Sequence, residues 1–137
     1  MLRLVSTALL IVAGGQGYGT EPQLYTGEVF IPSSGKSCSI SDLPDHRISH
    51  TMDGEYLCGS LWVQEDDVQK NCMRFSPEEN QWTYSHTLTE KRVGHSSWMT
   101  DQGLVLMGGW LSDSTSEILS LDGGKGRPAF EMNYKTK

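Results

Sequence analysis

An internal repeat with a period of about 45 residues limits the fold of this 137-residue chain more than any other feature of its sequence. The segment "PDHRISHT" is followed by "EKRVGHSS", so that Arg47 and His50 recur as Arg92 and His95, 45 positions later. A fixed period of this size is typical of architectures in which each unit buries its apolar faces against its neighbours. We therefore predict one domain made of three successive units, at residues 1–43, 44–89 and 90–137.

Other landmarks recur in step with the arginines and histidines. The runs "LLIVAGG", "GEYLCGS" and "GLVLMGG" are short and apolar, and each ends in small residues. They place five glycines at equivalent positions, namely Gly14, Gly15, Gly59, Gly108 and Gly109. "VFIP" returns as "RFSP", which makes Phe75 the equivalent of Phe30, and "KSC" ending at Cys38 takes the place of "NQW" ending at Trp82. Each unit is therefore expected to contain the same set of structural elements.

Within each unit the pattern favours β-structure throughout. Runs rich in Val, Ile, Tyr, Phe and Trp lie between turn-forming clusters such as "PSSGK", "SPEEN" and "TDQG", and no segment has the period of an amphipathic helix. The four strands predicted in the middle unit are Ile48–Thr51, Glu55–Gly59, Asn71–Phe75 and Gln81–His86. The third unit follows the same scheme, whereas the first unit lacks its first strand or forms it from residues 1–5. A four-stranded sheet repeated at this period is expected to stack on its neighbours, as propeller blades do.

The recurring residues resemble those of the kelch repeat family of β-propellers. That family has a glycine step closing the second strand, aromatic residues in the third and fourth strands, and an Arg and a His opening the next blade. The residues that carry the resemblance are Gly14, Gly15, Arg47, His50, Gly59, Phe75, Trp82, Arg92, His95, Gly108 and Gly109. The resemblance implies an all-β, kelch-type propeller fragment of about three four-stranded antiparallel blades, two complete and one partial. It also implies a structural role for these residues.

The N-terminal run "LLIVAGGQGYG" has three competing interpretations. A dinucleotide-binding loop is disfavoured, because Thr20 stands where the last glycine of that motif belongs and no helix is predicted to follow. A secretory signal remains open, since Arg3 precedes an apolar run of about ten residues. The same residues also match the repeat strand that ends at Gly109, so a blade strand remains open too. The localisation is left undecided, with a secreted protein favoured over a cytoplasmic one.

Composition excludes several classes of partner. The formal net charge is −6 and the 11 basic residues are scattered, so we expect no nucleic-acid partner. No run approaches the roughly 18 consecutive apolar residues of a membrane span.

Of the three cysteines, Cys58 ends a predicted second strand and Cys72 begins the third, so antiparallel pairing predicts a disulfide between them in an oxidising compartment. Cys38 would then be free.

No pattern in the sequence points to catalysis. A GxSxG motif is absent, and His46 and His50 have neither a CxxC motif nor a third ligand nearby. We therefore predict no catalytic residue, no metal site and no cofactor. One alternative is a piece of a kelch-like copper oxidase of the galactose-oxidase type, whose Tyr and His ligands would come from several blades. Another is a secreted, cysteine-containing structural domain.

The connections between second and third strands do not repeat, and they are where we expect binding. They are Gln16–Thr26, Leu61–Lys70 and Trp110–Ser116. A rigid scaffold that carries variable loops is a common arrangement for recognition, and aromatic residues dominate interface energetics. The candidate binding residues are Tyr18, Tyr25, Trp62, Glu65, Asp66, Asp67 and Trp110. A protein partner is expected, with a glycan as the alternative, and the chain alone is expected to self-associate through faces around Val12, Phe30 and Leu106.

Overall fold

The computed structural model describes residues 9–15, 24–60, 69–112 and 114–133, which form twelve β-strands and no helix. No helix in these ranges could therefore cross a membrane. Sheet 1 contains β1 (Leu10–Ala13), β2 (Gly27–Ile31) and β3 (Lys36–Ile40). Sheet 2 contains β4 (Thr51–Asp53), β5 (Tyr56–Cys58), β6 (Asn71–Ser76), β7 (Gln81–Thr87) and β11 (Gly124–Lys125). Sheet 3 contains β8 (Ser96–Thr100), β9 (Gly103–Met107), β10 (Thr115–Leu119) and β12 (Arg127–Glu131).

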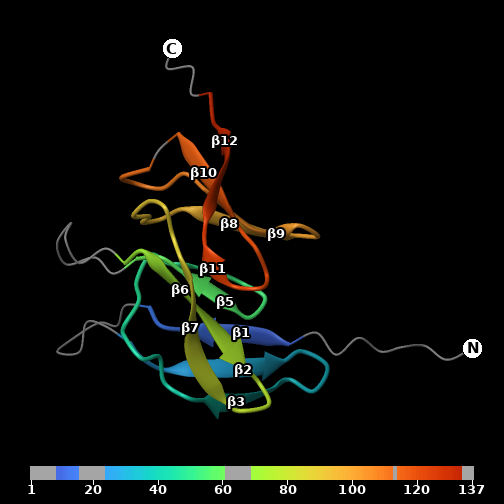
Figure 1. The fold of residues 1–137 in the computed structure, drawn as a ribbon. Helices are drawn as coiled ribbons and strands as arrows, with labels where there is room; N and C mark the ends of the chain where they lie inside the picture. Colours follow the sequence, from blue (N-terminus) through green and yellow to red (C-terminus); the bar gives the residue numbers. More distant parts are fainter. Residues whose placement is uncertain (1–8, 16–23, 61–68, 113, 134–137) are drawn as a thin grey trace, which may run out of the picture.

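The three sheets lie one above another, with sheet 2 in the middle, and none of them closes into a barrel (Figure 1). β1 to β3, β4 to β7, and β8, β9, β10 and β12 each form an antiparallel meander, and only β11 of sheet 2 pairs parallel among the described strands. The all-β prediction is confirmed, and the third unit has the four strands expected of it. The first unit has three strands in the part of the chain that the structure describes.

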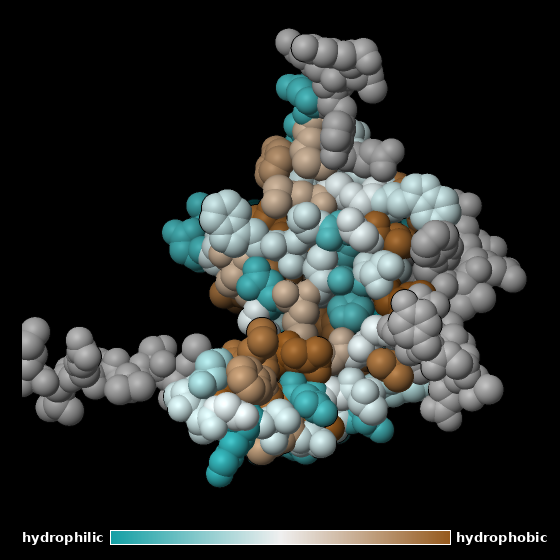
Figure 2. Space-filling view, turned by 180° about the vertical axis from the view of Figure 1, so that it is seen from behind, coloured by the Kyte–Doolittle hydropathy of each residue, from teal (hydrophilic) through white to brown (hydrophobic). Residues whose placement is uncertain are grey.

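Two apolar layers hold the stack together. Between sheets 1 and 2 the buried residues are Ala13, Leu43, Leu57, Met73, Phe75 and Trp82. Between sheets 2 and 3 they are Tyr56, Cys58, Cys72, Leu88, Leu104, Leu106 and Leu119. Because successive side chains of a strand point to opposite faces, the short apolar strand β5 contributes to both layers. Seen from behind, apolar side chains also gather at the surface beside the point where the grey N-terminal segment begins (Figure 2).

Three details differ from the sequence predictions. The strand expected at Ile48–Thr51 begins only at Thr51, because Ser49 has a φ of 53°, a left-handed conformation that interrupts extended backbone. Phe30 pairs with Ser37 just as Phe75 pairs with Trp82, so Ser37, and not Cys38, is the equivalent of Trp82. Leu106 is fully buried between sheets 2 and 3, so it lies on no exposed face.

The strand β11 was not expected at all. It lies in the connection between β10 and β12, and it crosses to sheet 2, where Gly124 and Lys125 pair parallel with the last residues of β7. The imidazole of His86 donates from Nε2 to Ser120 O at 2.5 Å and so fixes the start of this crossing. The segment covers one end of the outer edge of sheet 2, and exposed sheet edges are prone to unwanted pairing.

Candidate functional site

The three non-repeating connections leave the sheets at one end, which we call the loop end. Their bases are marked by the pairs Ala13 with Gly27, Cys58 with Cys72, and Met107 with Ser116. In Figure 1 these bases lie on the left of the molecule, whereas the β-turns that join β2 to β3 and β8 to β9 lie on the right. The sheets therefore bring together, at one end, the loops that sequence reasoning singled out.

A fully buried arginine holds the base of the middle loop. Arg47 donates from Nη1 to Gly59 O at 2.8 Å and from Nη2 to the side-chain oxygen of Asn71, so it joins the end of β5 to the start of β6. Its Nε donates to Asp45 Oδ1 at 2.6 Å, and this carboxylate balances the buried charge. Arg47 comes from the linker between sheets 1 and 2, so it also ties that linker to sheet 2.

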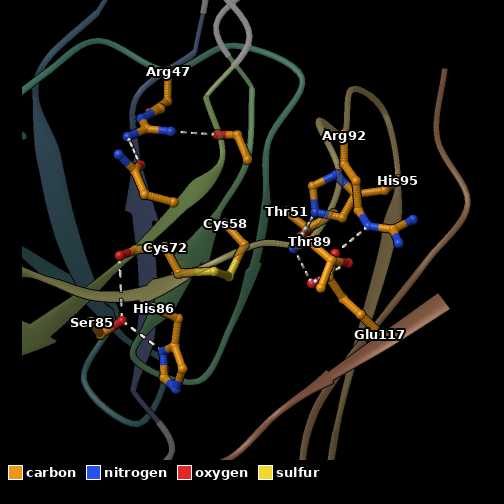
Figure 3. Close-up of a disulfide and its surroundings, with 12 residues drawn as sticks. Arg47, Thr51, Cys58, Cys72, Ser85, His86, Thr89, Arg92, His95 and Glu117 are labelled. Carbon is orange, nitrogen blue, oxygen red and sulfur yellow. Dashed lines mark hydrogen bonds and ion pairs between the residues drawn. A yellow bond between two sulfur atoms is a disulfide. The ribbon is translucent and has the colours of Figure 1, made fainter. Parts of the chain in front are cut away.

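Arg92 holds the base of the third loop in the same way. It donates from Nη1 to Gly108 O at 2.8 Å and to Thr115 O at 3.0 Å, and from Nη2 to Thr115 Oγ1 at 3.0 Å. Its counter-ion is Glu117, whose Oε1 accepts from Arg92 Nε at 2.8 Å while both side chains are fully buried. Figure 3 shows the two arginines on either side of the disulfide of sheet 2. The repeat thus places one arginine at the base of each of these two loops.

Glu117 is a buried charge that the sequence analysis does not predict. Besides Arg92 it accepts hydrogen bonds from the amide and the hydroxyl of Thr89, both at Oε2. In sheet 3 it holds the place that Met73 holds in sheet 2, as their spacing of 44 residues and their shared position in the third strand indicate. The signal was an acidic residue at an inward-facing position of "TSEIL", because a buried carboxylate requires a cationic partner.

A glycine and a histidine meet at each junction between sheets. At Gly14, a Cβ atom would lie 2.9 Å from Arg47 O and 3.2 Å from His50 Cε1. At Gly59, it would lie 2.9 Å from Arg92 O and 2.6 Å from His95 Cε1. Both glycines have positive φ values, +69° and +73°. Only glycine allows this close approach, so packing between the sheets requires a glycine directly after β1 and after β5.

Replacing Gly59 with alanine is expected to lower the free energy of unfolding by about 2 to 4 kcal/mol. The new methyl group would clash with the Arg92 carbonyl, and the alanine backbone would have to adopt a positive φ. Gly94→Ala is the matched control. Gly94 also has a positive φ, +61°, but a Cβ there would meet nothing within 4 Å, so a cost of about 1 kcal/mol is expected. Urea unfolding of both variants measures the difference. Equal costs would contradict close packing at Gly59.

His95 is the most perturbed titratable group at the junctions. Burial is the main cause that lowers its pKa from 6.5 to about 4, and the charges of Arg92 and His50 add to it. The pKa of His50 is lowered as well, chiefly by burial. His95 Nε2 is hydrogen-bonded to Thr51 Oγ1 at 2.7 Å, which joins the segment between β7 and β8 to β4, the first strand of sheet 2. The folded chain therefore favours the neutral imidazoles of His95 and His50.

The low pKa of His95 predicts a loss of stability in mild acid. The unfolded chain binds the proton more tightly than the folded chain, so stability falls as the pH drops below 6.5 and the effect is complete near pH 4. Between pH 6.5 and 5 we expect His95 to account for about 2 kcal/mol. Urea titrations at several pH values, with His95→Gln as the control, measure this contribution. A variant with the same pH dependence as the wild type would contradict it.

The predicted disulfide is confirmed. Cys58 and Cys72 are directly paired across β5 and β6, with their Cα atoms 4.1 Å apart and an S–S bond of 2.05 Å. Both are fully buried between sheets 2 and 3. The bond lies next to the residues bound by Arg47, so it closes the base of the middle loop covalently. Cys38 is free and exposed in β3, as expected.

The candidate binding residues fall into two groups. Tyr18, Trp62, Glu65, Asp66 and Asp67 lie outside the described residues. Tyr25 and Trp110 lie at the loop end, with exposed fractions of 44% and 52%. The hydroxyl of Tyr25 is 2.9 Å from His46 Nδ1, and the two rings pack edge to face. The backbone amide of Trp110 donates to Val93 O at 2.9 Å, which fixes the first residue of the third loop.

A groove of about 490 Å³ adjoins the base of the middle loop, and the sequence does not predict it. It is lined by Asn71, Tyr84, Ser85, His86, Thr87, Gly124 and Lys125. Tyr84 is 57% exposed, and its hydroxyl donates to Asp45 Oδ2 at 2.8 Å, which raises its pKa. This hydrogen bond links the groove to the carboxylate that balances Arg47. The lining of the groove thus includes an aromatic residue and a lysine.

The part of the chain that the structure describes holds no candidate metal site. Among the described residues, no three His, Cys, Asp or Glu side chains lie close enough together to hold a metal ion. The chain matches no protein-family model, and no curated protein is significantly similar to it in sequence. The resemblance to kelch repeats therefore rests on the repeating residues themselves.

Proposed function

We propose that the three sheets are kelch-type propeller blades and that the chain is a non-catalytic module that binds a protein partner at its loop end. The blade assignment is supported by the antiparallel meanders, the stacked order of the sheets and the recurrence of one Arg, His and Gly arrangement at both junctions. A repeated arrangement of this kind suits a scaffold, because a residue type that recurs in each unit serves the packing of each unit.

One observation carries the binding proposal. The connections that vary in length and composition share one end of the sheets, and buried arginines fix the bases of the second and third connections. Loops held at rigid bases lose less conformational entropy when they bind, which favours recognition. Tyr25, Trp110 and Tyr84 add exposed aromatic surface to this end, and aromatic residues are the usual hot spots of protein interfaces.

The proposal is tested by comparing the wild type with Trp62→Ala/Asp66→Lys, which removes an aromatic and inverts a charge in the middle loop. We expect the affinity of the variant for a partner captured by the wild type to be at least about tenfold lower, while the unfolding midpoint is unchanged. Asp101→Lys, at the opposite end in the turn between β8 and β9, is the matched charge control. The captured protein is then purified and its direct affinity for each variant is measured. Equal affinities would contradict binding at the loop end.

A further inference from the structure

The two outer sheets each have one face that no other described sheet covers. On sheet 1 this face carries Leu10 and Val12, which are 55% and 57% exposed, and their cross-strand partners Phe30 and Glu28. Exposed apolar side chains grouped on one sheet face are typical of an interaction surface.

The uncovered face of sheet 3 has a row of paired residues running across its four strands. Trp98 is opposite Val105, Val105 is opposite Ile118, and Ile118 is opposite Arg127. Trp98 is 66% exposed, whereas Val105 and Ile118 are half-buried. Directly opposite residues share a face, so this row forms one apolar strip that ends in a cation.

Several residues of the uncovered faces occupy repeat positions that are buried inside the stack. Val12 and Phe30 stand 45 residues before Leu57 and Phe75, which pack in the layer between sheets 1 and 2. When "GLVLMGG" is aligned with "GEYLCGS", Val105 stands at the position of Tyr56, which packs in the layer between sheets 2 and 3. These members of each uncovered face thus occupy positions that a neighbouring sheet covers elsewhere in the same chain, whereas Ile118 matches Arg74, whose side chain is exposed.

We infer that a second copy of this chain stacks on the first head to tail, with the uncovered face of sheet 1 in one copy against the uncovered face of sheet 3 in the other. The new contact would continue the interface that already joins sheet 1 to sheet 2 and sheet 2 to sheet 3. Two copies bring six sheets together, within the usual four to eight of a closed propeller. The inference does not rest on partner binding, because none of these residues lies in the loops.

Charge favours this arrangement over a symmetrical one. Glu28 is an exposed anion on the face of sheet 1, and Arg127 is an exposed cation on the face of sheet 3. Stacking sheet 1 on sheet 1, or sheet 3 on sheet 3, would bring like charges to one interface, which is unfavourable. Stacking sheet 1 on sheet 3 brings opposite charges together. The contact is therefore heterologous, with two different patches meeting.

The test uses the full chain in a Cys38→Ser background, which removes covalent dimers formed by the exposed thiol. Light scattering after size exclusion is expected to show a concentration-dependent species heavier than the 15.2-kDa chain. Val12→Glu and Trp98→Lys each place a charge on one of the two faces. Each is expected to raise the concentration required for association about hundredfold or more, because an unpaired charge is costly to bury. Ser33→Lys, in the exposed turn between β2 and β3, is the control and should associate like the parent.

Mixing the two variants distinguishes the head-to-tail contact from stacking of sheet 1 on sheet 1 or of sheet 3 on sheet 3. The Val12→Glu chain keeps an intact sheet 3 face and the Trp98→Lys chain keeps an intact sheet 1 face, so the mixture is expected to form a two-copy species that neither variant forms alone. The inference is overturned if the parent stays at the mass of one chain at all concentrations. It is also overturned if only one variant weakens association, if neither does, or if mixing restores nothing.

Discussion

Replacing Arg92 with methionine is expected to lower the free energy of unfolding by about 3 to 5 kcal/mol, a large part of the stability of a domain of this size. The substitution would leave the carboxylate of Glu117 fully buried without its counter-ion, and only the hydrogen bonds from Thr89 would remain. It would also free Gly108 O and the oxygens of Thr115 from their donor. Urea unfolding of the purified variant measures the loss.

A double variant identifies the cause of that loss. If the unpaired charge is responsible, Arg92→Met/Glu117→Leu should recover much of the stability lost by Arg92→Met alone, because an apolar pair can replace a buried ion pair at little cost. The two residues are in direct contact, so their effects are expected to be non-additive. A single-variant cost below about 1 kcal/mol, or two additive costs, would contradict the buried pair.

Reduction of the Cys58–Cys72 disulfide is expected to lower the free energy of unfolding by about 3 kcal/mol. The bond joins residues 14 positions apart, and opening a loop of about 15 residues restores that much chain entropy to the unfolded state. Thermal unfolding with and without a phosphine reductant measures the shift. Cys38→Ser is the control and should leave both transitions unchanged, since Cys38 is free and exposed. A reductant-insensitive transition, or a bridge that includes Cys38 in peptide mapping, would contradict the assignment.

Much of the fold could be predicted from the sequence because the repeat and the strand pattern point to the same answer. The strands around Phe75 and Trp82 and the four strands of the third unit follow from apolar runs between turn clusters. The start of β4 could not be predicted, since nothing in the sequence marks Ser49 as a residue with a left-handed backbone. The predicted equivalence of Cys38 and Trp82 was wrong, because the spacing of repeated residues along the sequence does not resolve a shift of one residue.

The site was predictable in outline only. Recurrence singled out Arg47 and Arg92, but it does not reveal that their guanidinium groups reach across to hold loop bases, because those contacts join residues 12 to 24 positions apart. The groove beside Tyr84 was also missed. It depends on β11, a two-residue strand that pairs parallel and whose sequence "GK" is too short to show any periodicity.

One arrangement of glycine and histidine builds both junctions of this stacked, repeating fold. A nuclear Overhauser spectrum of the folded chain tests it directly. The imidazole Hε1 of His95 should give a cross-peak to the α-protons of Gly59, and the Hε1 of His50 should give the equivalent cross-peak to Gly14, because each ring carbon lies against its glycine. Both cross-peaks together would support the repeated junction. The absence of either one in a well-resolved spectrum would contradict it.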